Sequence, residues 1–522
     1  MFKIKPLMAG IGAASFIFMV LATALFALVR FAIESDNLTV YFDSYLLHIL
    51  AITFYQSLLS TVLSIGFALL MAKALSMVDF KGKALLLKLM PITFILPTLV
   101  VVTGLLSVYG KQGLISVFFQ SLNLPYSLSI YGLQGILLAH VFLNFPYACC
   151  LFYRTLISVP VEHKQLAAQL NFSHFAFVKL IEWPLLRRQI LPMAALIFML
   201  CFSSFAVVLA LGGGPKFTTI EVAIYQSIRD FDIMQAVVLS ALQIVCCVTF
   251  ILLMQKLNQQ KKLSIKFVKA DYQLAIPGYL GFLCRIIIWV GVLFIFLPML
   301  TVLVEGIYYF RLSAINQSFL SALMFSILIA FGSAMIAMLL GLSLLWTNSR
   351  LLVFQQTKLS NYLMMIGSLI LVIPSMVLAS GLFLLLFRYA ENTLFICLLV
   401  MLCNGLMALP FVLKNLAAPM YDVTLRYWQL SQSLNITGLK HFYLIEFKAL
   451  KKLIMMSFAF SMILSLGDFG VIALFGGQSV ITLPYYLYEQ ISHYYYHDSM
   501  VTAAFLLILS LSILVVIDDD RT

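Results

Sequence analysis

Apolar runs of about 20 residues recur along the whole chain, and they constrain its fold more than any other feature. Each run is long enough to cross a bilayer core of about 30 Å as an α-helix. Backbone groups in lipid must bond internally, so spans are helices or closed barrels, and barrel strands alternate apolar and polar residues. The runs do not alternate, as residues 13–29 illustrate. We predict an all-α polytopic membrane protein with about twelve spans, near residues 7–30, 48–74, 88–109, 131–152, 190–211, 233–255, 279–305, 320–346, 362–387, 394–414, 454–476 and 500–517.

The charged residues support the same class and predict an orientation. Only 10% of the residues are charged, whereas a soluble domain carries about 25%. A net charge of +12 would suggest nucleic-acid binding in a soluble protein, but here Lys and Arg collect in alternate loops, as in membrane proteins. These basic loops lie near residues 73–88, 153–189, 256–270 and 415–453. We expect a bacterial inner-membrane protein that contacts lipid and not nucleic acid, with its N-terminus in the cytoplasm.

The first apolar run has a second possible meaning, because a signal peptide also begins with a basic residue and an apolar stretch. Its apolar region is about 7–15 residues long. The run here extends over residues 7–29. We therefore interpret it as a first span that is not cleaved.

Motifs for catalysis, metals or cofactors are missing from the sequence. The eight Cys residues lie in apolar segments without a CxxC or Cys/His cluster, which argues against a metal site. Gly110-Lys111 lacks the upstream Gly and the following Ser or Thr of a phosphate-binding loop. No Ser stands in a nucleophile elbow. We expect no cofactor and no enzymatic activity in this chain.

The second part of the chain repeats the first. Residues 165–171, Gln-Leu-Ala-Ala-Gln-Leu-Asn, match residues 429–435, Gln-Leu-Ser-Gln-Ser-Leu-Asn, at an offset of 264. Earlier spans align at a slightly larger offset, which pairs Leu96-Pro97 with Ile373-Pro374. We predict two tandem halves, 1–268 and 269–522, with six spans each. An even number of spans gives both halves the same orientation, which makes the repeat parallel.

A parallel repeat favours transport. Two similar bundles leave a pathway at their interface, and rocking of the bundles opens it to either side. The alternatives are a membrane enzyme or scaffold and an ion-coupled carrier that works without ATP. An enzyme or an ion-coupled carrier should place clusters of ionisable residues at membrane depth, and few such residues occur in the predicted spans.

Two long basic segments, 153–189 and 415–453, precede the fifth span of each half, and we refer to them as the coupling segments. Residues 161–180 predict an amphipathic helix, because Val161, Leu166, Leu170 and Phe177 recur at roughly helical spacing. Such a helix lies at the membrane surface or docks in a groove of a partner. Two copies at equivalent positions favour a partner with two similar surfaces.

The coupling segments resemble the cytoplasmic motif of type I ABC import permeases: Glu-Ala-Ala, three residues, Gly, nine residues, Ile, one residue, Leu-Pro. Gln replaces the Glu and Asn replaces the Gly in both halves, Trp183 replaces the Leu of the first half, and Lys448 stands where the second half should have Pro. The resemblance implies the type I permease fold. It also implies contact with separate ATPase subunits for Gln165, Leu166, Ala167, Ala168, Asn171, Ile181, Pro184, Gln429, Leu430, Ser431, Asn435 and Ile445.

A longer similarity narrows this class. Residues 165–215, and stretches such as 106–113, 131–140 and 467–470, resemble the permeases of bacterial thiamine importers. The resemblance implies ATP-driven uptake of thiamine and its phosphate esters. The implied partners are a homodimer of ATPase subunits and a periplasmic thiamine-binding protein. Ferric iron, a polyamine or an inorganic anion is the alternative cargo for the same architecture.

Five polar residues in or beside the spans are candidates for the transport pathway. A carboxylate at the bilayer centre costs about 2.5–3.5 kcal/mol or more, so Asp468 either contacts cationic thiamine or pins a helix. Interhelical hydrogen bonds are the alternative role for the others. The candidates are Asp468, its repeat equivalent Ser204, His140, Asn144 one turn further on, and Asn404, the repeat equivalent of His140.

Glycine-rich turns end the fifth predicted span of each half. Glycine lets the chain turn sharply. We expect both turns on the periplasmic side, where a binding protein would dock. They comprise Gly212, Gly213, Gly214 and Pro215 in the first half, and Gly476 and Gly477 in the second.

Overall fold

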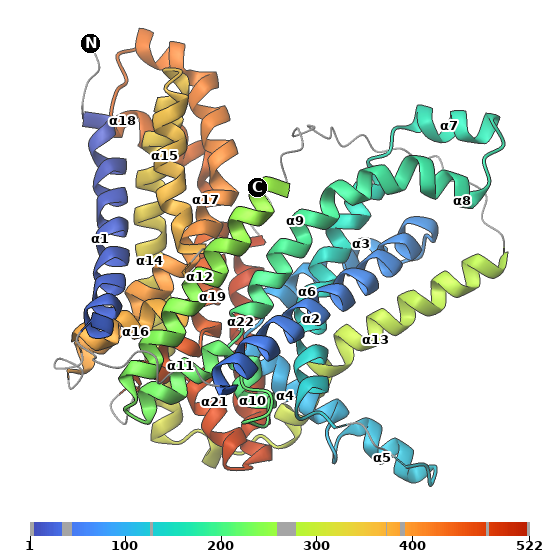
Figure 1. Cartoon of the computed structure of the whole chain (residues 1–522). Coiled ribbons are helices and arrows are strands. Elements are labelled where there is room, and N and C mark those ends of the chain that lie inside the picture. Colours follow the sequence, from blue (N-terminus) through green and yellow to red (C-terminus); the bar gives the residue numbers. More distant parts are fainter. Residues whose placement is uncertain are drawn as a thin grey trace.

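A computed structural model describes residues 5–33, 44–125, 129–257, 278–371, 373–386, 392–476 and 480–518 (Figure 1). These residues form helices joined by short connections, and the described ranges contain no β-strand. Eleven helical segments are long and apolar enough to cross a membrane, and a shorter apolar helix, Ser375–Leu386, accompanies them. The predicted all-α polytopic fold is confirmed. The predicted boundary at residues 268 and 269 lies outside the described residues.

The helices follow the same order in both halves. The first half contains α1 (Lys5–Ile33), α2 (Ser44–Met77), α3 (Lys83–Leu89), α4 (Thr98–Tyr109), α5 (Leu114–Ser121), α6 (Leu133–Ile157), α7 (Val161–Gln169), α8 (His174–Phe177), α9 (Trp183–Phe202), α10 (Ala206–Leu211), α11 (Ile220–Arg229) and α12 (Ile233–Leu257). The second half contains α13 (Gly278–Tyr308), α14 (Gln317–Val353), α15 (Thr357–Ser368), α16 (Ser375–Leu386), α17 (Thr393–Ser433), α18 (Leu439–His441), α19 (Lys448–Gly467), α20 (Gly470–Phe475), α21 (Leu483–Ser492) and α22 (Tyr496–Asp518).

The third span of each half is interrupted, which corrects the predicted spans 88–109 and 362–387. The first is divided between α3, a 3₁₀ turn and α4, and the second between α15 and α16. Pro97 and Pro374 stand directly before the helices that restart. Proline has no N–H and disfavours the helical conformation of the residue before it, so each helix ends and a new one begins.

The fifth predicted spans are also divided. The first is interrupted between α9 and α10, and the second between α19 and α20. Each coupling segment enters its fifth span through a short π-helix, Val178–Glu182 in the first half and Phe442–Phe447 in the second. The two π-helices occupy matching positions in the repeat.

Each half gives its first helix to the other half. Helix α1 packs on α14, α15 and α16, while α13 packs on α2 and α4. Two repeat-related glycines allow these contacts: a Cβ atom at Gly104 would lie 2.7 Å from the Pro298 carbonyl oxygen, and one at Gly381 would collide with the Ala24 carbonyl. Only glycine permits such a close backbone approach. The exchange ties the two bundles together.

The remaining contacts between the halves join α11 and α12 to α16, α11 to α20, and α21 and α22 to α4. Figure 1 shows α10, α11 and α21 gathered at the bottom of the view, whereas α7 and α18 lie far apart at the top. We refer to the top as the coupling end and to the bottom as the opposite end. Apart from the exchanged first helices, the halves therefore meet mainly at the opposite end, away from the coupling segments.

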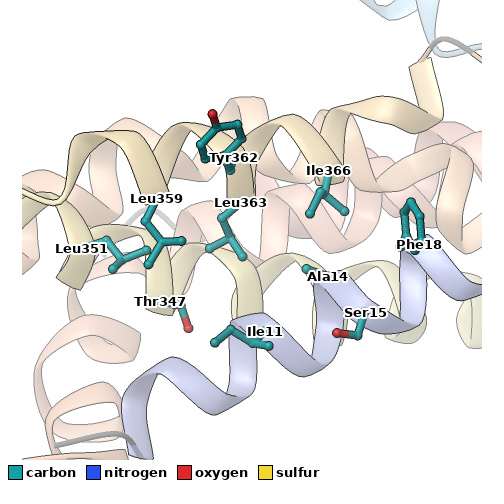
Figure 2. A pocket seen from close by; sticks show the side chains of 10 residues that line it. All are labelled: Ile11, Ala14, Ser15, Phe18, Thr347, Leu351, Leu359, Tyr362, Leu363 and Ile366. Atoms are coloured by element: carbon teal, nitrogen blue, oxygen red, sulfur yellow. The ribbon is translucent and has the colours of Figure 1, made fainter. Parts of the chain in front are cut away.

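An apolar groove of about 300 Å³ lies where α1 packs on α14 and α15 (Figure 2). The Gly10 N–H donates a hydrogen bond to Thr347 Oγ1 at 3.0 Å beside it. The lining side chains carry no charge, and the Tyr362 hydroxyl points away from the others in Figure 2. The groove belongs to the packing of the exchanged helix and lacks the groups that a cationic ligand requires.

Candidate functional site

The two coupling segments contain the same left-handed turn. Helix α7 is followed by Asn171 with φ 51°, and α17 is followed by Asn435 with φ 53°. In both, an N–H bonds back five residues, from Phe172 to the Ala167 carbonyl at 2.9 Å and from Ile436 to the Ser431 carbonyl at 2.8 Å. Glycine usually takes this position at a helix end, and Asn is the side chain that replaces it most readily. The Asn that departs from the family motif therefore preserves the turn.

This turn corrects the single amphipathic helix predicted over residues 161–180. The chain leaves the helix after α7 and re-enters it at α8 in a new direction. Phe177 is buried, whereas Leu166 and Leu170 are exposed, so these residues do not share one apolar face. Spacing alone suggested continuity, because the break depends on a left-handed residue that periodicity does not detect.

The two segments differ in how they join the preceding span. Pro160 precedes α7 and separates it from α6. The repeat position in the second half is Thr424, and there α17 continues without a break to Ser433. Pro160 has an extended backbone with ψ 144°, whereas Thr424 is helical. The second coupling segment is thus a helical continuation of its span.

Burial divides the predicted coupling residues into two groups. Ala167 and its equivalent Ser431 are buried, so their side chains support the segment from inside. Leu166 and Leu430 are 54% and 55% exposed, and Leu170 and Leu434 are similarly exposed. Gln165, Ala168 and Gln429 are exposed as well. Both copies present the same apolar side chains at the surface.

A buried glutamate in each π-helix holds the coupling segment to the bundle. In the first half Lys73, at the end of α2, donates to both carboxylate oxygens of Glu182 at 2.7 Å. Lys164 of α7 is close to this pair: burial lowers the pKa of its amino group, and the Glu182 carboxylate opposes that change. The neighbouring Ile181 and Pro184 are half-buried.

The second half has a more extensive version of the same contact. Arg350, at the end of α14, lies 3.2 Å from Glu446 Oε1, and the Thr424 hydroxyl donates to that oxygen at 2.8 Å. His441 Nδ1 lies 3.4 Å from the same oxygen. Ile445 beside it is half-buried. The sequence contains a signal for these pairs, since Lys73 and Arg350 match at the offset that pairs Pro97 with Pro374. The distribution of charges alone places Lys73 only in a basic loop.

The pathway candidates of the first half form an interhelical hydrogen-bond network. His140 contacts Ser60 Oγ at 3.0 Å through Nδ1 and Ser204 Oγ at 2.9 Å through Nε2. Asn144 donates to the His140 carbonyl at 2.8 Å. The network joins α2 and α6 to the break that follows α9.

The second half repeats this arrangement. Asn404 donates to Ser465 Oγ at 3.1 Å, and Ser465 donates to Ser333 Oγ at 3.0 Å. The Asp468 carboxylate accepts from the Val471 N–H at 3.2 Å and so caps α20. The cavity beside Asp468 measures about 10 Å³, room for about one water molecule. Asp468 thus makes a local helix-capping contact, as expected if its role is to pin a helix.

The glycine-rich turns lie at the opposite end. Gly213 adopts φ 61° after α10, and the adjacent Gly214–Pro215 peptide bond is cis. The Gly132 N–H donates to the Leu211 carbonyl at 2.7 Å, which joins the start of α6 to the end of α10. Gly476 follows α20, and Gly477 lies outside the described residues.

Comparison with known proteins agrees with this architecture. Residues 64–263 match the family "Binding-protein-dependent transport system inner membrane component". The chain is 42% identical to the thiamine transport system permease protein ThiP of Escherichia coli, over 94% of this chain and 91% of that protein. It is also 42% identical to ThiP of Haemophilus influenzae, over 93% and 90%, and 35% identical to ThiP of Brucella abortus, over 91% and 88%.

These similarities extend through both halves and include both coupling segments. They are too long to reflect only a shared membrane composition. The matched turns, the repeated buried glutamates and the exchanged first helices belong to one two-half permease architecture. The chain therefore belongs to the family of thiamine transport system permease proteins.

Proposed function

We propose that this chain is the membrane-spanning subunit of an ATP-driven importer that moves thiamine and its phosphate esters into the cytoplasm. The observation that carries the proposal is full-length similarity to relatives named as thiamine transport permeases. A further relative, a probable sulfate transport permease of Nephroselmis olivacea, is 27% identical over 39% of this chain. That shorter and weaker similarity supports the transporter class and favours sulfate less than thiamine.

ATP hydrolysis belongs to separate subunits in this proposal. The chain has no phosphate-binding loop. The paired coupling segments offer two similar docking surfaces, each with an exposed pair of leucines. Two copies of one ATPase subunit fit such a repeat. The buried Glu182 and Glu446 would then transmit motion of the docked subunits to α2 and α14.

The coupling end lies in the cytoplasm in this proposal. Lys73, Lys81 and Lys83 lie at or near the coupling end, where α2 ends and α3 begins. Acidic residues such as Asp230, Asp232 and Asp498 lie at the opposite end, around α11 and the start of α22. Basic residues concentrate on the cytoplasmic side of membrane proteins. The glycine-rich turns then face the periplasm, where a thiamine-binding protein would deliver its cargo.

Uptake in cells tests the cargo. A bacterial strain without its own thiamine permease and thiamine synthesis would express this chain together with the matching ATPase and binding protein. Growth at low external thiamine should be restored, and excess sulfate, spermidine or ferric citrate should not compete with labelled thiamine. Competition by one of these compounds, or no growth at normal expression, would contradict the thiamine assignment.

A further inference from the structure

The two halves meet at the opposite end through a set of aromatic side chains. Phe205 directly precedes α10, and its repeat equivalent Phe469 precedes α20. Their rings stack across the two halves with centroids 5.6 Å apart and an interplanar angle of 20°. Tyr225 of α11 contacts Phe205 at 5.2 Å, and Tyr488 of α21 contacts Phe469 at 4.8 Å. The contact therefore lies on the approximate symmetry axis of the repeat.

Two carboxylates belong to the elements that carry these rings: Glu221, one turn before Tyr225 on α11, is fully buried, whereas Asp468, directly before Phe469, is partly exposed. Glu221 also lies close to the backbone of Met376 in the other half. Asp468 is near enough to act electrostatically on Glu221. Gly470 lies close to both the Phe205 ring and Asp468. A Cβ atom at Gly470 would lie 3.4 Å from the Phe205 ring and 3.9 Å from Asp468 Oδ1. Asp468 thus lies beside the stacked rings, and Glu221 lies one helical turn from Tyr225, whose ring contacts Phe205.

Within the described ranges, only one of the two carboxylate oxygens of Glu221 accepts a hydrogen bond from a side chain. Gln243 donates to Oε1 at 2.9 Å, but Oε2 is buried without a hydrogen-bond partner in the described part of the chain. Among the described residues, neither Glu221 nor Asp468 forms an ion pair, although the Arg229 guanidinium lies 5.6 Å from the centre of the Tyr225 ring. A buried carboxylate without a cationic partner is costly, and buried ionisable groups often mark functional sites. Sequence reasoning missed Glu221 because it lies outside the predicted spans.

We propose that Glu221, with the Phe205–Phe469 pair, forms a transient site for the cationic ring of the substrate, exposed when the halves separate at the opposite end. The proposal rests on the function proposed above. Thiamine carries a permanently charged thiazolium ring and a flat aminopyrimidine. Aromatic faces attract a cation and stack on flat rings, and a carboxylate adds opposite charge. In the closed arrangement the same rings cover the carboxylates and seal the path between the halves.

The test is a Glu221→Gln variant in the complete complex with ATPase and binding protein, reconstituted in liposomes. The amide keeps an oxygen for the Gln243 hydrogen bond and removes only the charge. We expect stimulation of ATP hydrolysis by the loaded binding protein to persist, while thiamine imported per ATP falls about tenfold. Phe469→Leu, which keeps apolar volume but loses the ring, should act in the same direction.

Glu305→Gln is the matched control, because both Glu305 oxygens are hydrogen-bonded, to Ser107 and Tyr496 at 2.8 Å, away from the aromatic pair. The amount of thiamine that this variant imports per ATP should equal that of the wild type. Parallel loss of ATP hydrolysis and uptake in Glu221→Gln would assign Glu221 a structural role and overturn the proposal, as would unchanged uptake in both test variants. If the wild-type complex itself imported no thiamine, the proposed function would fail instead.

Discussion

Replacing Leu166 and Leu430 together with Glu should nearly abolish association with the ATPase subunits while the chain still inserts and folds. Both side chains are more than half exposed at equivalent positions of the coupling segments, so the fold does not depend on them. Burying a leucine in an interface contributes about 1.5–3 kcal/mol, or about 10- to 100-fold in affinity. Each single variant should lose about 10- to 100-fold in affinity for the ATPase subunits. The measurement is the amount of ATPase subunit that stays bound to the purified chain.

Gln169→Glu is the matched control for this experiment. It adds the same charge on the exposed surface of α7 and keeps both leucines. Its association should stay within about twofold of the wild type, because an exposed charge contributes little. If Leu166→Glu and Leu430→Glu retained the ATPase as well as this control does, the coupling segments would not be the docking surface. Ala167 and Ser431 are unsuitable for the test, since both are buried and a bulky side chain there would disturb the fold.

Replacing Arg350 with Met should lower the stability of the second half markedly. The Arg350 and Glu446 side chains are only 5% and 0% exposed, so the variant leaves a buried carboxylate without its cation. Breaking one side of a buried ion pair costs about 3–5 kcal/mol. The midpoint of thermal unfolding in detergent should fall, and uptake should fall with it. Adding Glu446→Gln should recover part of the loss, because the stranded charge is then removed.

Lys83→Met is the control that leaves a solvated carboxylate. The Lys83 side chain is 14% exposed, but its partner Asp79 is 63% exposed, and pairs with a solvated partner contribute about 0–1 kcal/mol. Lys73→Met should fall between the two, since the Glu182 side chain that it leaves is 7% exposed while the Lys73 side chain is 25% exposed, so some water reaches the pair. Equal midpoints for Arg350→Met and Lys83→Met would contradict the role given to Glu446.

The membrane class and the repeat could be predicted from the sequence, whereas the turns at Asn171 and Asn435 could not. The length of an apolar run depends on residues close in sequence, and the repeat is a direct match between two stretches of sequence, so neither signal requires a structure. The interrupted third spans were missed because an average over apolar residues hides the effect of Pro97 and Pro374. Both prolines were already visible as a repeated pair, and each marked a break.

Contacts between residues far apart in the sequence were harder to predict from the sequence. Nothing local to α1 or α13 indicates that each packs on the other half, although Gly104 and Gly381 mark where they approach. The pairing of Lys73 with Glu182 joins residues 109 apart. Glu221 follows a predicted turn and looked like a loop residue until the structure placed it beside Met376 and Asp468. The role of a polar residue such as Glu221 can be inferred only once its neighbours in the folded chain are known.

Thiamine uptake by liposomes that contain this chain, the ATPase and the binding protein tests the central claim most directly. Labelled thiamine should accumulate only when ATP is present on the side of the coupling segments and the binding protein on the other. Omitting the ATPase should stop transport, and the chain alone should bind no nucleotide, because it has no phosphate-binding loop. Accumulation without the ATPase, driven by an ion gradient, or accumulation of another cargo but not of thiamine, would contradict the account.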